Sequence, residues 1–280
     1  MSYLQCGDRR LDLSRPQVMG ILNVTPDSFS DGGRFVGGDA AQAHAGRMVE
    51  AGATIIDIGG ESTRPGAQPV DAAAELDRVL PVLESVLPLD VVVSVDTMKT
   101  PVMREAIRAG AHLINDVNAL QAPDALQVVA QSSAAACLMH MQGEPRTMQQ
   151  QPHYEDVAAE VGAFLLDRRQ AALDAGIAAD RILLDPGFGF GKSLAHNLQL
   201  LSGLEALCAL GSPILVGLSR KSMFEKLLGR PVEGRLAASV TAAVLAAQRG
   251  ASVIRVHDVR ETMDALRVLD AVQLQRELKQ

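Results

Sequence analysis

Residues 182–193, with the sequence ILLDPGFGFGKS, place a carboxylate and three alternating glycines directly after a short apolar run. Glycine allows another group to approach the backbone closely, so this stretch indicates a turn built around a site. It is not a common phosphate-binding loop. A Walker A loop would need glycine where Pro186 stands, and a dinucleotide fingerprint would need G-x-G-x-x-G. What remains is Asp185 at the end of a strand, where parallel α/β folds bind their ligands.

Polar residues recur near the ends of apolar runs along the whole chain. They are Asn23, Asp96, Asn115, Asp185, Lys221, Arg255 and His257. A lone carboxylate or amide of this kind is more often a helix cap or turn residue than a ligand contact. Because the C-terminal ends of parallel strands meet on one face, however, their recurrence predicts one shared site. Arg255 argues most strongly for function, since Arg in an apolar strand is costly unless an anion or a carboxylate meets it.

Other ionisable residues carry weaker signals. Asp57 alternates with Ile56 and Ile58 and could point into a barrel, where it would need a partner such as Arg or Ser. Its role stays open. Isolated histidines predict surface or packing roles, and these are His44, His112, His153 and His196. His140, which stands between two methionines, is ambiguous.

Eight short apolar segments alternate with segments of helical composition. The expected strands are 18–23, 54–58, 91–95, 113–114, 135–139, 182–185, 214–218 and 252–256. The expected helices lie near 40–50, 71–87, 101–109, 124–131, 154–175 and 198–210, with further helical segments up to residue 249. This alternation predicts an α/β fold, a (β/α)8 TIM barrel, with a short N-terminal hairpin that turns at Gly7 and Asp8. An open doubly wound sheet is the alternative. No linker interrupts the pattern, so residues 1–280 are expected to form a single domain.

The composition narrows the class of ligand. The chain is 48% hydrophobic but only 3% aromatic and has no tryptophan, which is typical of aliphatic parallel strands covered by helices. A formal net charge of -7 opposes broad attraction to nucleic acid or to anionic lipid. We therefore expect small-molecule substrates, with no nucleic acid and no membrane as partner.

The cysteines and the N-terminal residues favour a cytoplasmic protein. Cys6, Cys137 and Cys208 are few and far apart, which fits neither a disulfide framework nor a paired zinc site. Asp8, Arg9, Arg10 and Asp12 stand where a signal peptide would need its apolar segment, and no apolar run reaches membrane-spanning length.

Read together, five stretches resemble one known family. They are NVTPDSFSDGG at 23–33, GESTRPG at 60–66, DPGFGFGK at 185–192, SRKS at 219–222 and RVHD at 255–258. In this order and length they resemble the bacterial dihydropteroate synthases over residues 16–270. The resemblance implies a barrel enzyme and a homodimer. It also implies a transferase that joins 4-aminobenzoate to 6-hydroxymethyl-7,8-dihydropterin diphosphate, releasing pyrophosphate and forming 7,8-dihydropteroate for folate. Sulfonamides are expected to compete with 4-aminobenzoate.

The resemblance also assigns roles to individual positions. It implies catalytic roles for Asp96, Asp185, Lys221, Arg255 and His257. The pterin would be bound by Asp96, Asn115, Asp185 and Lys221, with Met139 also in the substrate pocket. The diphosphate would be bound by Asn23, Arg255, His257 and Arg64 or Thr63, with Mg²⁺ bridging Asn23 to phosphate oxygens. The carboxylate of 4-aminobenzoate would be bound by Ser222, and its ring would lie between Phe29, Pro65 and Phe190. A carboxylate pair suits the N–H donors of a pterin and stabilises positive charge, which favours an SN1-like departure of pyrophosphate.

Two other functions fit a pterin-binding barrel. A methyltransferase acting on a folate would keep the pterin-binding acids but would not need Arg255 and His257 as an anion site. A non-catalytic paralogue would be expected to lose one or more of the loop motifs, and all of them are present here.

Overall fold

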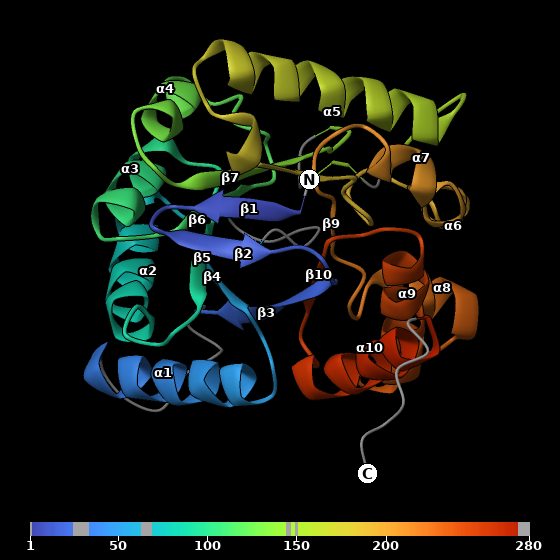
Figure 1. The fold of residues 1–280 in the computed structure, drawn as a ribbon, viewed down its shortest axis with the longest axis horizontal. Helices are drawn as coiled ribbons and strands as arrows, with labels where there is room; N and C mark the ends of the chain where they lie inside the picture. The colour runs from blue at the N-terminus through green and yellow to red at the C-terminus, as the bar shows by residue number, and fades with distance from the viewer. Residues whose placement is uncertain (1, 25–33, 63–68, 144–146, 149–150, 274–280) are drawn as a thin grey trace.

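The structure is a computed structural model that describes residues 2–24, 34–62, 69–143, 147–148 and 151–273. Its central sheet is parallel, and the strands follow one another around a barrel (Figure 1). In sheet order they are β8 (Ile182–Asp185), β7 (Ala135–Met139), β6 (Leu113–Asp116), β5 (Val92–Asp96), β4 (Ile55–Gly59), β3 (Gln17–Asn23), β10 (Val253–Val256) and β9 (Leu215–Val216). A parallel bridge between Leu184 and Ile214 brings the two edges of the sheet together. The predicted TIM barrel is confirmed.

Helices follow the strands and form the outer ring of the barrel (Figure 1). They are α1 (Arg34–Glu50), α2 (Ala72–Val86), α3 (Thr100–Arg108), α4 (Ala125–Ala130), α5 (Val157–Asp174), α6 (Leu194–Ser202), α7 (Leu204–Cys208), α8 (Ser222–Leu228), α9 (Leu236–Gln248) and α10 (Val259–Gln273). Two short 3₁₀ turns, η2 (Ala179–Arg181) and η3 (Val232–Gly234), precede β8 and α9. No helix in the described ranges is long and apolar enough to cross a membrane.

Several boundaries differ from the sequence prediction, and capping explains two of them. The helix predicted near 198–210 is two helices, and the first begins at Leu194 because the Ser193 hydroxyl accepts from the backbone N–H of His196 at 3.2 Å. The helix expected from residue 154 begins at Val157, after the Asp156 carboxylate caps it. The strand predicted over 214–218 is shorter, with β9 confined to residues 215–216.

Successive residues of each strand face opposite sides of the barrel wall. One apolar set packs between the strands and the helices, and it includes Val18, Ile56, Val93, Ile114, Ala136, Ile182, Val216 and Ile254. The alternate set packs inside the barrel, and it includes Met19, Ile55, Val92, Leu113, Ala135, Leu183, Leu215 and Val253. Both faces are therefore buried, which is why the strands read as continuous apolar runs.

The N-terminal hairpin closes the end of the barrel at which the strands begin. Strands β1 (Tyr3–Cys6) and β2 (Arg9–Asp12) pair antiparallel, as predicted, and lie across the barrel in Figure 1. Leu4, Cys6 and Leu11 join the apolar cluster inside the barrel. The backbone N–H of Gly7 donates to the carbonyl of Ser133 at 3.0 Å, beside the start of β7. The open end of the barrel is therefore the one at which the strands finish.

We predict that Leu4→Ala lowers the free energy of unfolding by about 2 to 5 kcal/mol, because it leaves a cavity under the barrel core. Leu4 is 0% exposed. The control is Leu198→Ala on α6, where the side chain is 40% exposed and the expected change is about 0.5 kcal/mol or less. Urea unfolding of both variants measures the difference, and equal effects would show that the hairpin does not seal the core.

Candidate active site

Arg255 is the centre of a buried ion network inside the open end of the barrel. Its Nε donates to Asp57 Oδ2 at 2.6 Å, and one terminal nitrogen donates to Asp96 Oδ2 at 2.8 Å. Asn115 Nδ2 donates to the same oxygen of Asp57 at 3.0 Å. The sequence predicted that Arg255 would need an anion or a carboxylate, and the structure supplies two carboxylates, those of Asp57 and Asp96. Arg255 is also the partner of the kind that the sequence suggested for Asp57. Four strands, β4, β5, β6 and β10, contribute to this network.

The network fixes the protonation and the orientation of its members. Burial raises the pKa of Asp96 to about 7, while the Arg255 guanidinium opposes the rise and the charge of Asp57 adds to it. Burial alone would lower the pKa of Arg255, but the two carboxylates raise it above its ordinary value, so Arg255 stays charged. Because Asn115 uses its NH₂ group on Asp57, its carbonyl oxygen is left as an acceptor.

Asp185 ends β8 and is held by the glycine-rich turn that follows it. Its Oδ1 accepts from the backbone N–H of Gly187 at 2.7 Å, and the residue is 6% exposed. Burial raises the pKa of Asp185, and the Gly187 hydrogen bond and the charge of Lys221 oppose that rise. Asp185 is thus a third carboxylate fixed at the same end of the barrel.

The glycines of this turn are required by the protein's own backbone. Gly187, Gly189 and Gly191 have φ of 69°, 80° and 61°. A Cβ on Gly187 would overlap the carbonyl oxygen of His140, and one on Gly191 would overlap the carbonyl oxygen of Gln142. The close approach that the sequence predicted is therefore made by the segment after β7, and glycine is the residue that permits it.

Two aromatic or apolar side chains accompany the charged groups. Lys221 Nζ lies 4.2 Å from the centroid of the Phe190 ring, a cation–π distance. Met139, 3% exposed, ends β7 and would touch a Cβ placed on Gly187. The structure thus brings Phe190, Lys221 and Met139 to the turn that carries Asp185.

His257 is fixed by the SRKS segment. Its Nδ1 lies 3.0 Å from the hydroxyl of Ser219, and that hydroxyl also accepts from the His257 backbone N–H at 3.2 Å. Arg220 makes two hydrogen bonds with Asp258, at 3.0 Å from Nε and 2.5 Å from a terminal nitrogen. Ser219 and Arg220 therefore tie the loop after β9 to the end of β10, so that Lys221 and His257 share one mouth.

The remaining predicted residues fall into two groups. Asn23 is exposed at the end of β3, and its Oδ1 would lie 3.6 Å from a Cβ on Gly59 of the neighbouring strand. Ser222 is exposed and is the first residue of α8. The other four lie outside the described residues, and they are Phe29, Thr63, Arg64 and Pro65.

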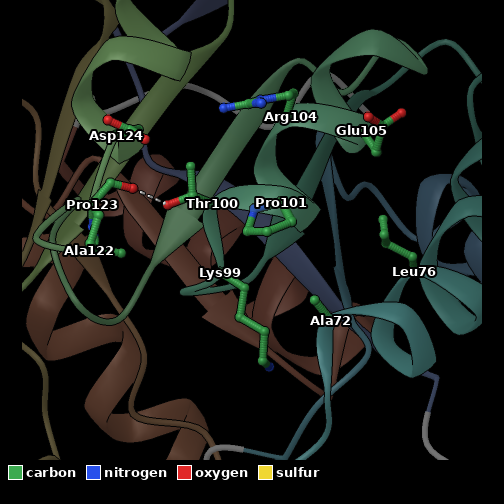
Figure 2. A pocket seen from close by; sticks show the side chains of 10 residues that line it. All are labelled: Ala72, Leu76, Lys99, Thr100, Pro101, Arg104, Glu105, Ala122, Pro123 and Asp124. Carbon is green, nitrogen blue, oxygen red and sulfur yellow. Dashed lines mark hydrogen bonds between the residues drawn. The ribbon is translucent and has the colours of Figure 1, made fainter.

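Glu61, from the second motif, has a structural partner. Its carboxylate accepts from the backbone N–H of Val70 at 2.9 Å and pairs with the Lys99 ammonium, which also binds Glu75. Burial alone would lower the pKa of Lys99, but these hydrogen bonds raise it. Lys99 also borders a cavity of about 670 Å³, in which its side chain points away from Arg104 (Figure 2). The lining of this cavity includes none of the predicted site residues.

Sequence reasoning missed two residues at the site. Lys192 belongs to the quoted DPGFGFGK motif but was given no role, and His140 was left ambiguous. In the structure the Lys192 ammonium lies 2.9 Å from His140 Nδ1, and both side chains are buried. The available signal was the position of Lys192 directly after three glycines that form a tight turn.

The described residues fit Mg²⁺ only as a partner of a phosphate ligand. They contain no group of three or more His, Cys, Asp or Glu that could hold a metal. The amide oxygen of Asn23 is a hard donor of the kind that Mg²⁺ accepts, and Mg²⁺ commonly keeps several waters and substrate phosphate oxygens. Asn23 therefore suits a metal bound mainly by diphosphate and water.

Comparison with known proteins agrees with this geometry. Residues 19–257 match the family described as pterin binding enzyme, and the chain belongs to that family. Among its relatives, the dihydropteroate synthase of Escherichia coli strain K12 is 52% identical over 270 residues, which are 96% of each chain. The chain therefore belongs to the dihydropteroate synthases, which are transferases.

Solved structures of relatives share the fold closely. The Yersinia pestis dihydropteroate synthase in a sulfonamide drug complex has a TM-score of 0.92 at 53% identity, covering 97% of this chain and 99% of that one. The Xanthomonas albilineans dihydropteroate synthase with 4-aminobenzoic acid has a TM-score of 0.91 at 55% identity, covering 97% and 98%. These likenesses favour a synthase over the methyltransferase and non-catalytic alternatives.

We predict that Gly187→Ala, in the turn after β8, lowers the free energy of unfolding by more than the strain of Ala at a positive φ accounts for. The matched control is Gly229→Ala, since Gly229 has φ of 65° but no heavy atom within 4 Å of a Cβ placed there. Both variants carry the cost of Ala at positive φ, about 1 to 2 kcal/mol. Only Gly187→Ala adds overlap with the His140 carbonyl. Equal losses in the free energy of unfolding would contradict the proposed packing of the turn.

The raised pKa of Asp96 predicts a pH-dependent stability. Between its ordinary pKa of 3.8 and about 7, the folded state binds a proton that the unfolded state has released. The Asp96 contribution to stability is therefore present below the ordinary pKa and is lost as pH rises through about 7. Asp96→Asn removes this dependence, so the stability of the variant relative to wild type should increase from pH 5 to pH 8. Urea unfolding at both pH values measures this, and a constant difference would refute the raised pKa.

Proposed function

We propose that the residues around Arg255 are the active site at which the chain condenses 6-hydroxymethyl-7,8-dihydropterin diphosphate with 4-aminobenzoate, forming 7,8-dihydropteroate and pyrophosphate. The observation that carries this proposal is the gathering of Asp96, Asn115 and Asp185 at the end of one barrel around the partly buried guanidinium of Arg255. Membership of the dihydropteroate synthases supports the reaction, and the geometry supports the location.

The acceptor groups suit the pterin. The amino-pyrimidinone edge of a pterin presents neighbouring N–H donors, which carboxylate and amide oxygens accept. Asp185 is held by Gly187, and the carbonyl oxygen of Asn115 is oriented by the bond of its NH₂ group to Asp57. Lys221 would donate to the pterin carbonyl or a ring nitrogen. Because these groups are fixed before the substrate arrives, little ordering is needed on binding.

The same groups would stabilise bond cleavage. In an SN1-like step the bond between the pterin methylene and the diphosphate oxygen breaks, and its electron pair leaves with the diphosphate. The cation that remains is delocalised over the pterin, and the carboxylates of Asp96 and Asp185 would stabilise it electrostatically. The amine of 4-aminobenzoate then donates its lone pair to the methylene, and a proton leaves the nitrogen. No enzyme nucleophile is needed.

The leaving diphosphate would be compensated at the mouth of the site. His257 and Asn23 are proposed as two of its ligands, and Arg255 would interact through N–H groups that it does not use on Asp57 and Asp96. Because those two carboxylates already neutralise Arg255, its charge is weaker toward an anion than the sequence alone indicated. Bound Mg²⁺ would supply the missing positive charge to the diphosphate oxygens. Arg64 and Thr63 are proposed as further anion ligands.

4-Aminobenzoate would bind beside the pterin. Phe190 lies next to Lys221 and could contact the aromatic ring, while Ser222 at the start of α8 could donate to the carboxylate. Phe29 and Pro65 remain proposed ring contacts. The relative from Xanthomonas albilineans was solved with 4-aminobenzoic acid, which supports this substrate. The sulfonamide complex of the Yersinia pestis relative supports competition by sulfonamides.

We also propose a homodimer in the cytoplasm. Exposed apolar side chains near α8 and the start of α9 would be covered by a second copy, and they are Leu227, Leu228, Val232 and Leu236. The resemblance to the family supports the dimer. The few and widely spaced cysteines support a reducing compartment.

A coupled assay for pyrophosphate release tests the function directly. Wild-type protein should form 7,8-dihydropteroate, and release pyrophosphate fastest, when both substrates and Mg²⁺ are present. Asp185→Asn should weaken pterin binding by about 1 to 3 kcal/mol, roughly 5- to 150-fold, because the amide turns a donor toward the pterin N–H groups. The control is Asp167→Asn, which should behave as wild type because Asp167 is exposed on α5. Pyrophosphate release that 4-aminobenzoate does not accelerate, or unchanged pterin affinity in Asp185→Asn, would contradict the assignment.

A further inference from the structure

Lys192 is a buried lysine with a complete set of acceptors. Its side chain is 2% exposed, and its Nζ lies 2.9 Å from His140 Nδ1 and 3.0 Å from the carbonyl oxygens of Gly187 and Phe190. An ammonium has three N–H donors, so these partners satisfy it fully. His140 can accept because burial, together with the nearby Lys192 charge, lowers its pKa to about 3 and keeps the ring neutral.

Burial alone disfavours a charge at this position. Burial lowers the pKa of Lys192 to about 7, although the charge of Asp185 opposes that shift and Lys221 adds to it. Removing one partner of a buried polar network leaves the other groups unsatisfied and is destabilising. The three hydrogen bonds of Lys192 therefore offset the cost of its burial, and they fix the positions of the groups that accept them.

The acceptors of Lys192 lead directly to the substrate-binding residues. Gly187, whose carbonyl oxygen accepts from Lys192, also donates its N–H to Asp185. Phe190, whose carbonyl oxygen accepts from Lys192, places its ring beside Lys221. One ammonium therefore holds both ends of the turn that orients the pterin-binding carboxylate and the Phe190–Lys221 pair.

From these contacts we infer that Lys192 is a positioning residue for the reaction. Its ammonium ties the turn 187–190 to His140 and thereby holds Asp185 and Phe190 in the geometry that binds the pterin and the ring of 4-aminobenzoate. The inference rests on the proposed function for its effect on catalysis, but its effect on the turn is independent of any substrate. Tyr154 holds the residue after this turn, since its hydroxyl donates to the carbonyl of Gly191 at 2.9 Å.

The test compares Lys192→Met, which removes the donors, with Lys192→Gln, which keeps two N–H donors without the charge. The matched control is Lys226→Met, because Lys226 is exposed on α8. For each protein we would measure hydrogen exchange over 187–191, urea unfolding, binding of 6-hydroxymethyl-7,8-dihydropterin diphosphate by calorimetry, and the KM for 4-aminobenzoate.

Lys192→Met should speed amide exchange in the turn, weaken pterin binding about tenfold or more and raise the KM for 4-aminobenzoate, and it should also lower global stability because three buried acceptors lose their donor. Lys192→Gln should be intermediate, and Lys226→Met should match wild type. Wild-type exchange and affinity in both Lys192 variants would overturn the inference, as would a loss of stability with unchanged affinity in the folded protein. If wild type itself bound no pterin, the proposed function would fail, and the exchange data would still decide whether Lys192 holds the turn.

Discussion

The ion pairing of Arg255 with Asp57 and Asp96 is the interaction on which the active site depends. Below it the barrel is filled by apolar side chains and sealed by the hairpin, so these charges lie at the floor of a region with little water. Removing one partner of such a network leaves an uncompensated buried charge, which typically costs about 3 to 5 kcal/mol. Asp57 Oδ1 has no hydrogen-bond partner in the described part of the chain, so Arg255 and Asn115 alone hold that carboxylate.

At the open end of the barrel, carboxylates and cationic side chains lie close together and offset one another's charge. The carboxylates of Asp57, Asp96 and Asp185 face cations at Lys192, Lys221 and Arg255. Such a set can hold a pterin through its N–H groups, stabilise the pterin cation, and still leave N–H donors for a departing anion. Rigid placement matters more here than acid strength, because the reaction needs no enzyme nucleophile.

The fold was predictable because the strands are buried on both faces and polar residues recur at or near their C-terminal ends, so strand number and active face could both be read from the sequence. The starts of α6 and α5 differ from the predicted starts because Ser193 and Asp156 cap these helices. A capping residue decides where a helix begins more strongly than the composition around it does. Asp57 needed a partner that the sequence could name only by type, because Arg255 is distant along the chain. Lys192 and His140 could not be paired in advance, as their contact depends on how two loops pack. The sequence predicted that the glycines allow a close approach to the backbone. It did not show that the approaching groups are the backbone of His140 at Gly187 and of Gln142 at Gly191.

We expect Asp57 to position the pterin site through its ion pair with Arg255, without contacting the substrate itself. A double-mutant cycle with Asp57→Asn and Arg255→Met, read as the Kd for 6-hydroxymethyl-7,8-dihydropterin diphosphate, tests it most directly. Each single variant should bind more weakly than wild type, and the double variant should lose little beyond the weaker single variant, because both changes break the same pair. Wild-type affinity in Asp57→Asn, or strictly additive losses, would contradict this role of the Asp57–Arg255 pair.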